Sequence, residues 1–132
     1  MKSGIIYALY YNNMPFYIGQ TTKLLKTRFS QHKCFSFSEQ AYNYNNTKRY
    51  LYNYIRSITT YESFYTDITI RLLKVVNIYE LDSEEVRYIK HCINNKINLY
   101  NSCVKTNLYC VLKYKKTIEE YNSCVLTNTY LE

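Results

Sequence analysis

The sequence predicts an α/β fold of the α+β kind, with a small three-stranded, mainly antiparallel sheet flanked by helices. The first observation is the order of elements, which is strand, strand, helix, helix, strand, helix. The second is the length, because 132 residues are enough for one domain with a substantial core. We expect a folded domain over residues 1–101, and an extension over residues 102–132 that packs on this core or trails from it.

The N-terminal part predicts a hairpin that runs into a helix. The apolar run Ile5–Tyr11 is bounded by glycine and asparagine and predicts a strand. Asn13–Pro15 predicts a turn, and Phe16–Ile18 predicts a second strand that stops at Gly19. We expect Thr21 or Thr22 to cap the helix that follows.

The elements after this helix follow from periodicity. Residues 33–47 are polar without a clear period and predict a loop, with a turn of helix near 38–42, and Thr47 is the expected cap of the next helix. The apolar positions 50, 51, 54, 55 and 58 form one helical face. The β-branched residues of 68–76 predict a central strand. Ser83 is the expected N-cap of a last helix that ends near Asn94.

The charge of the chain favours a polyanionic partner. Lysine and arginine together number 17, aspartate and glutamate 10, so the net charge is +7, and 18 tyrosines accompany it. Basic and aromatic residues in this combination are typical of nucleic-acid binding, and ordinary solubility is the alternative. No apolar run is long enough to span a membrane, and no signal peptide is evident.

The cysteines indicate a reducing compartment. There are five, an odd number, and none form a Cys-x-x-Cys pair. We therefore expect buried free thiols and an intracellular protein of the cytoplasm or nucleus. The abundance of Tyr, Asn, Ile and Lys is typical of AT-rich genomes, which include viral genomes, so a viral protein acting in a host cell is among the expectations. A zinc site with His91 and the cysteines is the alternative, although the spacing matches no common zinc pattern.

Four polar side chains of the hairpin and helix can face one cleft. Tyr7 and Tyr17 lie on the two predicted strands, and Arg28 and His32 lie one helical turn apart. Taken singly, each has an ordinary structural role as core tyrosine or surface helix residue. Their joint spacing is what indicates a functional site.

These residues resemble the catalytic module of the GIY-YIG nucleases. The family pattern is a glycine-hydrophobic-tyrosine strand, a Tyr-Ile-Gly strand, a threonine-containing turn, and a helix with Arg-x-x-x-His. Here Tyr17-Ile18-Gly19 is intact, whereas Ile5-Ile6-Tyr7 stands where Gly-Ile-Tyr is usual, with Gly4 one position earlier. The resemblance extends from Gly4 to Asn101 and implies the family's small three-stranded sheet with helices.

A metal-binding carboxylate is expected at the start of the last helix, where Glu84 and Glu85 are the candidates. Glu85 precedes Ile89 by four residues and so continues the apolar stripe, whereas Glu84 points about 100° away. A buried carboxylate is unfavourable unless it is paired or binds metal. The family pattern also has a glutamate followed by an aromatic residue and isoleucine, and here Glu85 is followed by Tyr88 and Ile89. Interaction with the helix dipole is the alternative role.

The resemblance implies a role for each residue. Tyr7 is the general base, Tyr17 binds the attacking water or a phosphate oxygen, and Arg28 binds the scissile phosphate. His32 bonds the Tyr7 hydroxyl or the phosphate. Glu85 holds one Mg²⁺ (or Mn²⁺) ion. Gly19 lets the backbone pass closely at the turn from strand to helix, and Asn101, with Asn98 as competitor, holds the loop or a water near the metal.

The expected partner is DNA, and no small-molecule cofactor is expected. The basic residues expected to contact its phosphates are Lys23, Lys26, Lys33, Lys48 and Arg49. For Lys48, Arg49 and Arg56 a solvated helix face is the alternative. Together with the basic charge, the resemblance thus implies a magnesium-dependent endonuclease that hydrolyses DNA phosphodiester bonds by a one-metal mechanism. The alternatives are an inactive nucleic-acid-binding module on the same fold and, less favoured, an interaction protein with a tyrosine-rich surface. Substrate choice and oligomeric state stay open.

Overall fold

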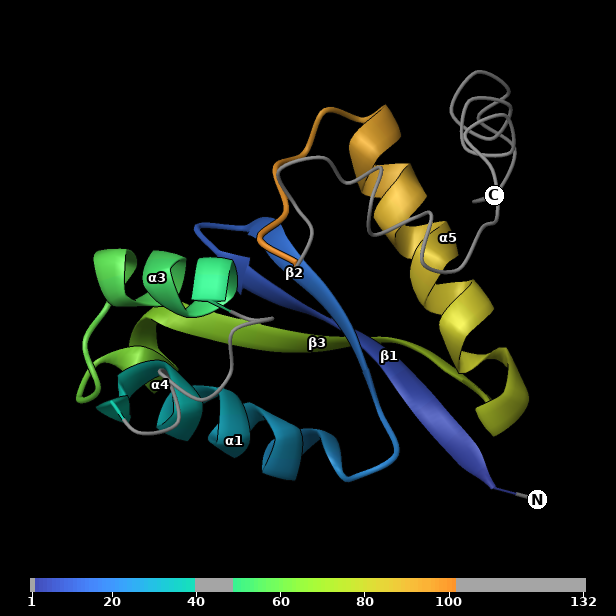
Figure 1. Cartoon of the computed structure of the whole chain (residues 1–132), viewed down its shortest axis with the longest axis horizontal. Helices are drawn as coiled ribbons and strands as arrows, with labels where there is room; N and C mark the ends of the chain where they lie inside the picture. The colour runs from blue at the N-terminus through green and yellow to red at the C-terminus, as the bar shows by residue number, and fades with distance from the viewer. Residues whose placement is uncertain (1, 40–48, 102–132) are drawn as a thin grey trace.

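The computed structural model describes residues 2–39 and 49–101. The predicted extension over 102–132 and the predicted cap Thr47 lie outside this range. The elements are β1 (Ser3–Tyr11), β2 (Met14–Thr21), α1 (Leu25–Phe37), α3 (Arg49–Ile58), α4 (Phe64–Asp67), β3 (Ile68–Asn77), the 3-10 helix η2 (Ile78–Glu80) and α5 (Leu81–Asn94). The strands form one antiparallel sheet in the order β2-β1-β3 (Figure 1). The predicted fold class is confirmed.

The β1–β2 hairpin turns on two asparagines. Asn12 and Asn13 have φ angles of 52° and 64°, and two successive left-handed residues produce the turn that matches the twist of antiparallel strands. The strand therefore resumes at Met14, so the prediction of a turn over Asn13–Pro15 was late by one residue. Pro15 is tolerated because β2 is an edge strand. In this register Tyr7 lies opposite Gly19.

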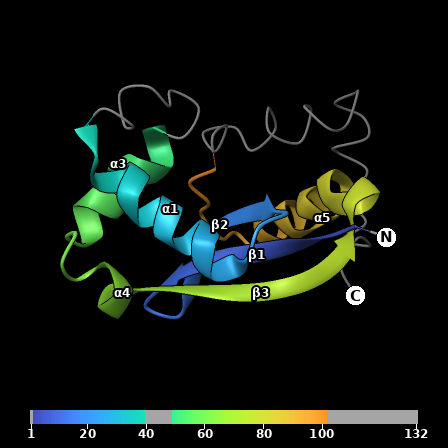
Figure 2. The same ribbon diagram turned by 90° about the horizontal axis from the view of Figure 1, so that it is seen from below.

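The two faces of the sheet build two cores. Ile6 and Ala8 of β1 belong to the core that α5 covers, whereas Tyr7 and Leu9 belong to the core with residues of α3 and α4. This alternation is the ordinary two-residue period of a strand. Figure 1 shows α5 apart from α1, α3 and α4, with the strands between them, and Figure 2 shows α1 and α3 side by side.

Helix α1 differs from its prediction at both ends. It continues to Phe37, so the loop expected from residue 33 was wrong. Arg28, His32 and Ser36 lie one turn apart on the inward side and are polar, so the apolar residues of α1 that pack on the core do not form a continuous stripe. At its start the N-cap position is Leu24, without a side-chain cap. Thr21 Oγ1 instead accepts a hydrogen bond from the Lys23 N–H at 3.0 Å.

The second half of the chain corrects two further predictions. Strand β3 is an edge strand, because β1 lies between it and β2. Its exposed Leu72 and Val75 agree with that place. Helix α5 begins at Leu81, directly after η2, so Ser83 is not its N-cap, and the Ser83 hydroxyl donates to the Glu80 carbonyl at 3.1 Å. The predicted end at Asn94 is confirmed. None of the helices described is long and apolar enough to cross a membrane.

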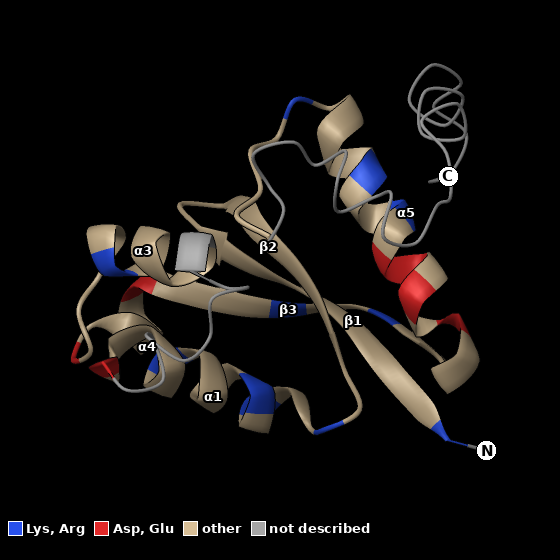
Figure 3. Ribbon diagram, viewed as in Figure 1, with Lys and Arg blue, Asp and Glu red and all other residues tan. Residues whose placement is uncertain are grey.

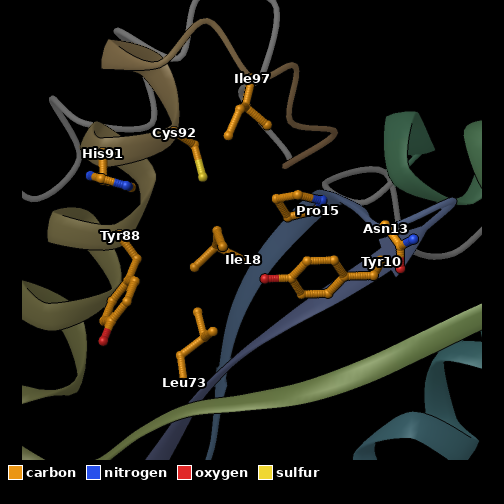
Figure 4. A pocket seen from close by; sticks show the side chains of 9 residues that line it. All are labelled: Tyr10, Asn13, Pro15, Ile18, Leu73, Tyr88, His91, Cys92 and Ile97. Carbon is orange, nitrogen blue, oxygen red and sulfur yellow. The ribbon is translucent and has the colours of Figure 1, made fainter.

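A pocket of about 610 Å³ lies on the α5 face of the sheet (Figure 4). It is lined by Tyr10, Asn13, Pro15, Ile18, Leu73, Tyr88, His91, Cys92 and Ile97.

Burial raises the pKa of the Cys92 thiol to about 11, so this thiol stays protonated at neutral pH. Cys92 is buried as predicted, whereas Cys34 is exposed, which the prediction of buried thiols did not foresee.

Candidate active site

A buried hydrogen-bonded cluster joins β1 to α1. The Tyr7 hydroxyl lies 2.6 Å from His32 Nε2, and Arg28 Nε donates to the same hydroxyl at 3.2 Å. Tyr7 and His32 are fully buried, and Arg28 is half-buried. Because Arg28 already donates to the phenolic oxygen, the single phenolic proton is available to bond His32 Nε2. The structure thus brings together three of the residues expected to share a cleft.

Tyr17 of β2 completes this group. Its ring centroid lies 6.2 Å from that of Tyr7 and 5.4 Å from that of His32, which it meets edge-on. Tyr17 is 6% exposed. All four residues predicted for one site therefore lie in contact on one face of the sheet, between β1, β2 and α1.

Gly19 makes room for the two tyrosines. A Cβ atom at this position would lie 2.6 Å from both Cζ and Oη of Tyr7, and 2.7 Å from Cε2 of Tyr17. No glycine among the described residues has a positive φ, so conformational freedom is not the reason for this glycine. Gly19 lies inside β2, and the prediction that it serves the turn from strand to helix was wrong.

The two glutamates at the start of α5 are both buried, at 5% exposure for Glu84 and 8% for Glu85. Glu84 Oε1 lies 2.9 Å from Lys74 Nζ and 3.4 Å from Arg87 Nη1. Lys74 comes from β3, and Glu84 is thus buried as well, which the expectation of an apolar stripe that continues through Glu85 did not foresee. The charge of Glu85 raises the pKa of both Tyr7 and Tyr17. Of the two carboxylates, Glu85 is the one whose charge acts on the tyrosine cluster.

Burial keeps the phenols of the cluster neutral. It raises the pKa of Tyr7 to about 12, although the charge and hydrogen bond of Arg28 act in the opposite direction. Burial, followed by the charges of Tyr7 and Glu85, raises the pKa of Tyr17 well above its ordinary value. At neutral pH both hydroxyls therefore carry their protons and can act as hydrogen-bond donors.

We expect alkaline pH to unfold the protein because of these tyrosines. In the unfolded chain they ionise near pH 10, whereas in the folded protein Tyr7 ionises only near pH 12. The unfolded state therefore binds fewer protons above pH 10, and stability, which is fully present below pH 10, falls as pH rises toward 12. Urea unfolding at pH 8, 10 and 11, with tyrosinate absorbance as a second signal, measures this loss. A constant stability across this range would contradict it.

Tyr52 of α3 is a member of the site that the sequence did not indicate. It is fully buried in the same core as Tyr7 and Tyr17. Burial raises its pKa to about 12, with the charge of Arg28 acting to lower it. The predicted helical face comprised positions 50, 51, 54, 55 and 58, so it did not include Tyr52. Its spacing of three from Ile55 is the signal that places both on one face.

Asn101 fixes the chain after α5 to β2. Its Oδ1 accepts from the Ile18 N–H at 3.2 Å, and its Nδ2 donates to the Ile18 carbonyl at 2.7 Å. Asn101 is buried, whereas Asn98 is exposed. One side chain thus pairs with the outer edge of β2 beside Tyr17. This contact holds the loop in place, which is one of the two roles expected for the asparagine.

The basic residues expected to contact DNA lie in different settings. Lys23 and Lys26 are exposed. Lys33 Nζ lies 4.1 Å from the ring centroid of Tyr61 and 4.5 Å from that of Tyr65. Lys48 and the side chain of Arg49 lie outside the description. Arg56, for which a solvated face and phosphate contact were both open, donates through Nε to the Ser36 carbonyl and so joins α3 to α1.

Charge is distributed unevenly over the elements. Figure 3 shows the acidic residues of α5 in its N-terminal half, whereas the charged segments of α1 are basic.

Within residues 2–39 and 49–101, no three His, Cys, Asp or Glu side chains are grouped so that they could hold a metal ion. Comparison of the chain with protein-family models, with curated proteins and with solved structures found no match.

Proposed function

We propose that the protein is a magnesium-dependent endonuclease that hydrolyses DNA phosphodiester bonds. The observation that supports this most is the contact of Tyr7 with both His32 and Arg28. A neutral phenol, an imidazole and a half-buried guanidinium are the groups that phosphodiester hydrolysis uses to move a proton and to stabilise an anion. The net charge of +7 favours DNA as partner.

Arg28 is the group that would bind the phosphate. Its Nε now donates to Tyr7 and its Nη1 donates to Gln31 at 3.2 Å. A phosphate is a stronger acceptor than a phenol or an amide, because it is charged. We expect the guanidinium to turn from these two neutral partners to two phosphate oxygens, which frees one acceptor site on the Tyr7 oxygen for the attacking water.

Tyr7 and His32 would then move the proton of that water. Because the pKa of Tyr7 is about 12, its phenolate form is scarce at neutral pH. Tyr7 is therefore protonated before the reaction and needs a partner that takes its proton. His32 Nε2 lies 2.6 Å away and can take the phenolic proton as the oxygen receives one from water. The proton passes from water to Tyr7 while another passes from Tyr7 to His32. The hydroxide then forms a bond to phosphorus as the bond from phosphorus to one sugar oxygen breaks, and this leaving oxygen takes up a proton from solvent.

Glu85 would hold the metal ion. Mg²⁺ binds through one or two carboxylates together with waters and substrate phosphates, so a single buried carboxylate is compatible with it. Structural zinc, by contrast, needs four nitrogen or sulfur ligands, so a single carboxylate fits Mg²⁺ better than zinc. When bound, the ion would lower the pKa of a water and offset the charge of the scissile phosphate. Mn²⁺ is expected to replace Mg²⁺ because it accepts the same oxygen ligands.

We expect Glu85→Gln to lower the rate of plasmid nicking by at least about 100-fold, because the amide is uncharged and binds Mg²⁺ weakly. Glu84→Gln is the matched control, since Glu84 is the neighbouring buried carboxylate and pairs with Lys74 and Arg87. The control should lose some stability and keep its rate within a few-fold. Each protein is incubated with supercoiled plasmid and Mg²⁺, and the rate at which nicked circles form is measured. No nicking by the wild type, or equal nicking by Glu85→Gln, contradicts the proposal.

A nucleic-acid-binding module without activity is the second candidate. The observation that favours it is the complete burial of Tyr7 together with its pKa of about 12. This candidate predicts DNA binding that weakens with salt, and no cleavage in Mg²⁺ or Mn²⁺. Binding measured at two salt concentrations beside the nicking assay separates the two functions.

A further inference from the structure

Tyr52 carries a buried hydroxyl that makes no hydrogen bond to any of the described residues. The side chain is fully buried, and no described group lies within hydrogen-bonding distance of its oxygen. A buried polar group without a partner costs about 1–3 kcal/mol. Phenylalanine would fill the same space without that cost, so the packing of residues 2–39 and 49–101 gives no reason for the hydroxyl.

The hydroxyl lies at the tyrosine cluster. Tyr52 shares its core with Tyr7 and Tyr17, and α3 packs against α1, which carries Arg28 and His32. The charge of Arg28 acts on Tyr52, and Tyr52 in turn acts on Tyr7 and Tyr17. The unsatisfied donor therefore lies in the core that holds the tyrosine cluster, within the electrostatic range of the guanidinium that would bind the phosphate.

We propose that Tyr52 is a further substrate-contacting residue whose hydroxyl donates to a non-bridging phosphate oxygen once Arg28 turns toward the phosphate. This inference rests on the proposed function and adds a donor to it. The phosphate supplies a partner that the hydroxyl does not find among the described residues, and the desolvated position of the hydroxyl makes the bond strong. Because the phenol is neutral, it adds a donor without adding a charge next to Arg28.

Tyr52→Phe removes only this oxygen. Since the hydroxyl has no partner in the part of the chain that the structure describes, the melting temperature should stay the same or rise. The kcat for nicking should fall on the order of 100-fold, as for loss of one donor to a developing anion, with a smaller change in KM. A lowered melting temperature would show that the hydroxyl is bonded in the free protein and would overturn the proposal.

Tyr54→Phe is the matched control on the same helix. Tyr54 is half-buried and its ring stacks on Tyr100 at a centroid distance of 4.0 Å, which phenylalanine preserves. This variant should nick at the wild-type rate. Equal losses in the two variants would mean that α3 tolerates no change, and would overturn a specific role for Tyr52.

A second measurement does not depend on cleavage. Inorganic phosphate should raise the melting temperature of the wild type and of Tyr54→Phe, and raise that of Tyr52→Phe clearly less. This difference supports the contact even where no DNA is cleaved, in which case the proposed nuclease activity fails by itself. No shift in the wild type, or an equal shift in Tyr52→Phe, overturns the contact whether or not the wild type nicks DNA.

Discussion

Replacing Arg28 with lysine is expected to lower the plasmid-nicking rate by roughly 10³-fold and to leave the fold intact. The guanidinium presents Nε to Tyr7 and Nη1 to Gln31 at the same time, so its donors are already arranged in a fork. Lysine keeps the charge but offers one ammonium group, which cannot bind two phosphate oxygens in that planar geometry. Initial rates in Mg²⁺ at saturating DNA, together with the melting temperature, measure the effect.

Arg71→Lys is the control for this substitution. Arg71 is exposed on β3, with its Cζ 4.2 Å from the ring centroid of Tyr10, so the same change of chemistry is made away from the cluster. We expect its rate to stay within a few-fold of the wild type. If Arg28→Lys also stays within a few-fold, charge alone is enough at this position and the forked contact with phosphate is not part of the reaction.

The sequence predicts the elements whose side chains alternate by hydrophobicity. The strands of the hairpin, β3, and the apolar stripe of α5 each follow a period of two or of about 3.6 residues, so their order and the fold class could be predicted. Helix α1 could not be bounded in this way, because the buried positions His32 and Ser36 are polar and interrupt its apolar pattern. The Ser36 hydroxyl donates to the His32 carbonyl at 2.6 Å, so that buried position is satisfied locally and leaves no apolar signal.

Only those features of the site that depend on spacing within one helix or strand could be predicted from the sequence. Arg28 and His32 lie one turn apart, which helical geometry gives directly. The burial of Glu84 depends on Lys74 of β3, and the reason for Gly19 depends on the ring of Tyr7 across the strand pair. These contacts arise between elements, so no period within one element can reveal them.

Gly19→Ala is expected to abolish measurable nicking and to destabilise the fold by about 1–3 kcal/mol, as for overpacking of a core. The new methyl group would lie 2.6 Å from Oη of Tyr7, which is far inside contact distance. The Tyr7 ring is fully buried and its hydroxyl is bonded to His32 and Arg28, so it can yield only by breaking those bonds. Nicking assays and urea unfolding measure the two effects.

Gly4→Ala separates loss of the site from loss of stability. A Cβ at Gly4 would lie 2.6 Å from the methyl groups of Leu81, so this variant also overpacks a buried position, but in the core that α5 covers. We expect it to lose stability by a similar amount and to keep nicking. If the two alanine variants nick alike at equal stability, the position of the Tyr7 hydroxyl does not control the reaction. If only Gly19→Ala is inactive, the space that this glycine leaves is needed for the hydrogen bonds of Tyr7, and through them for the chemistry.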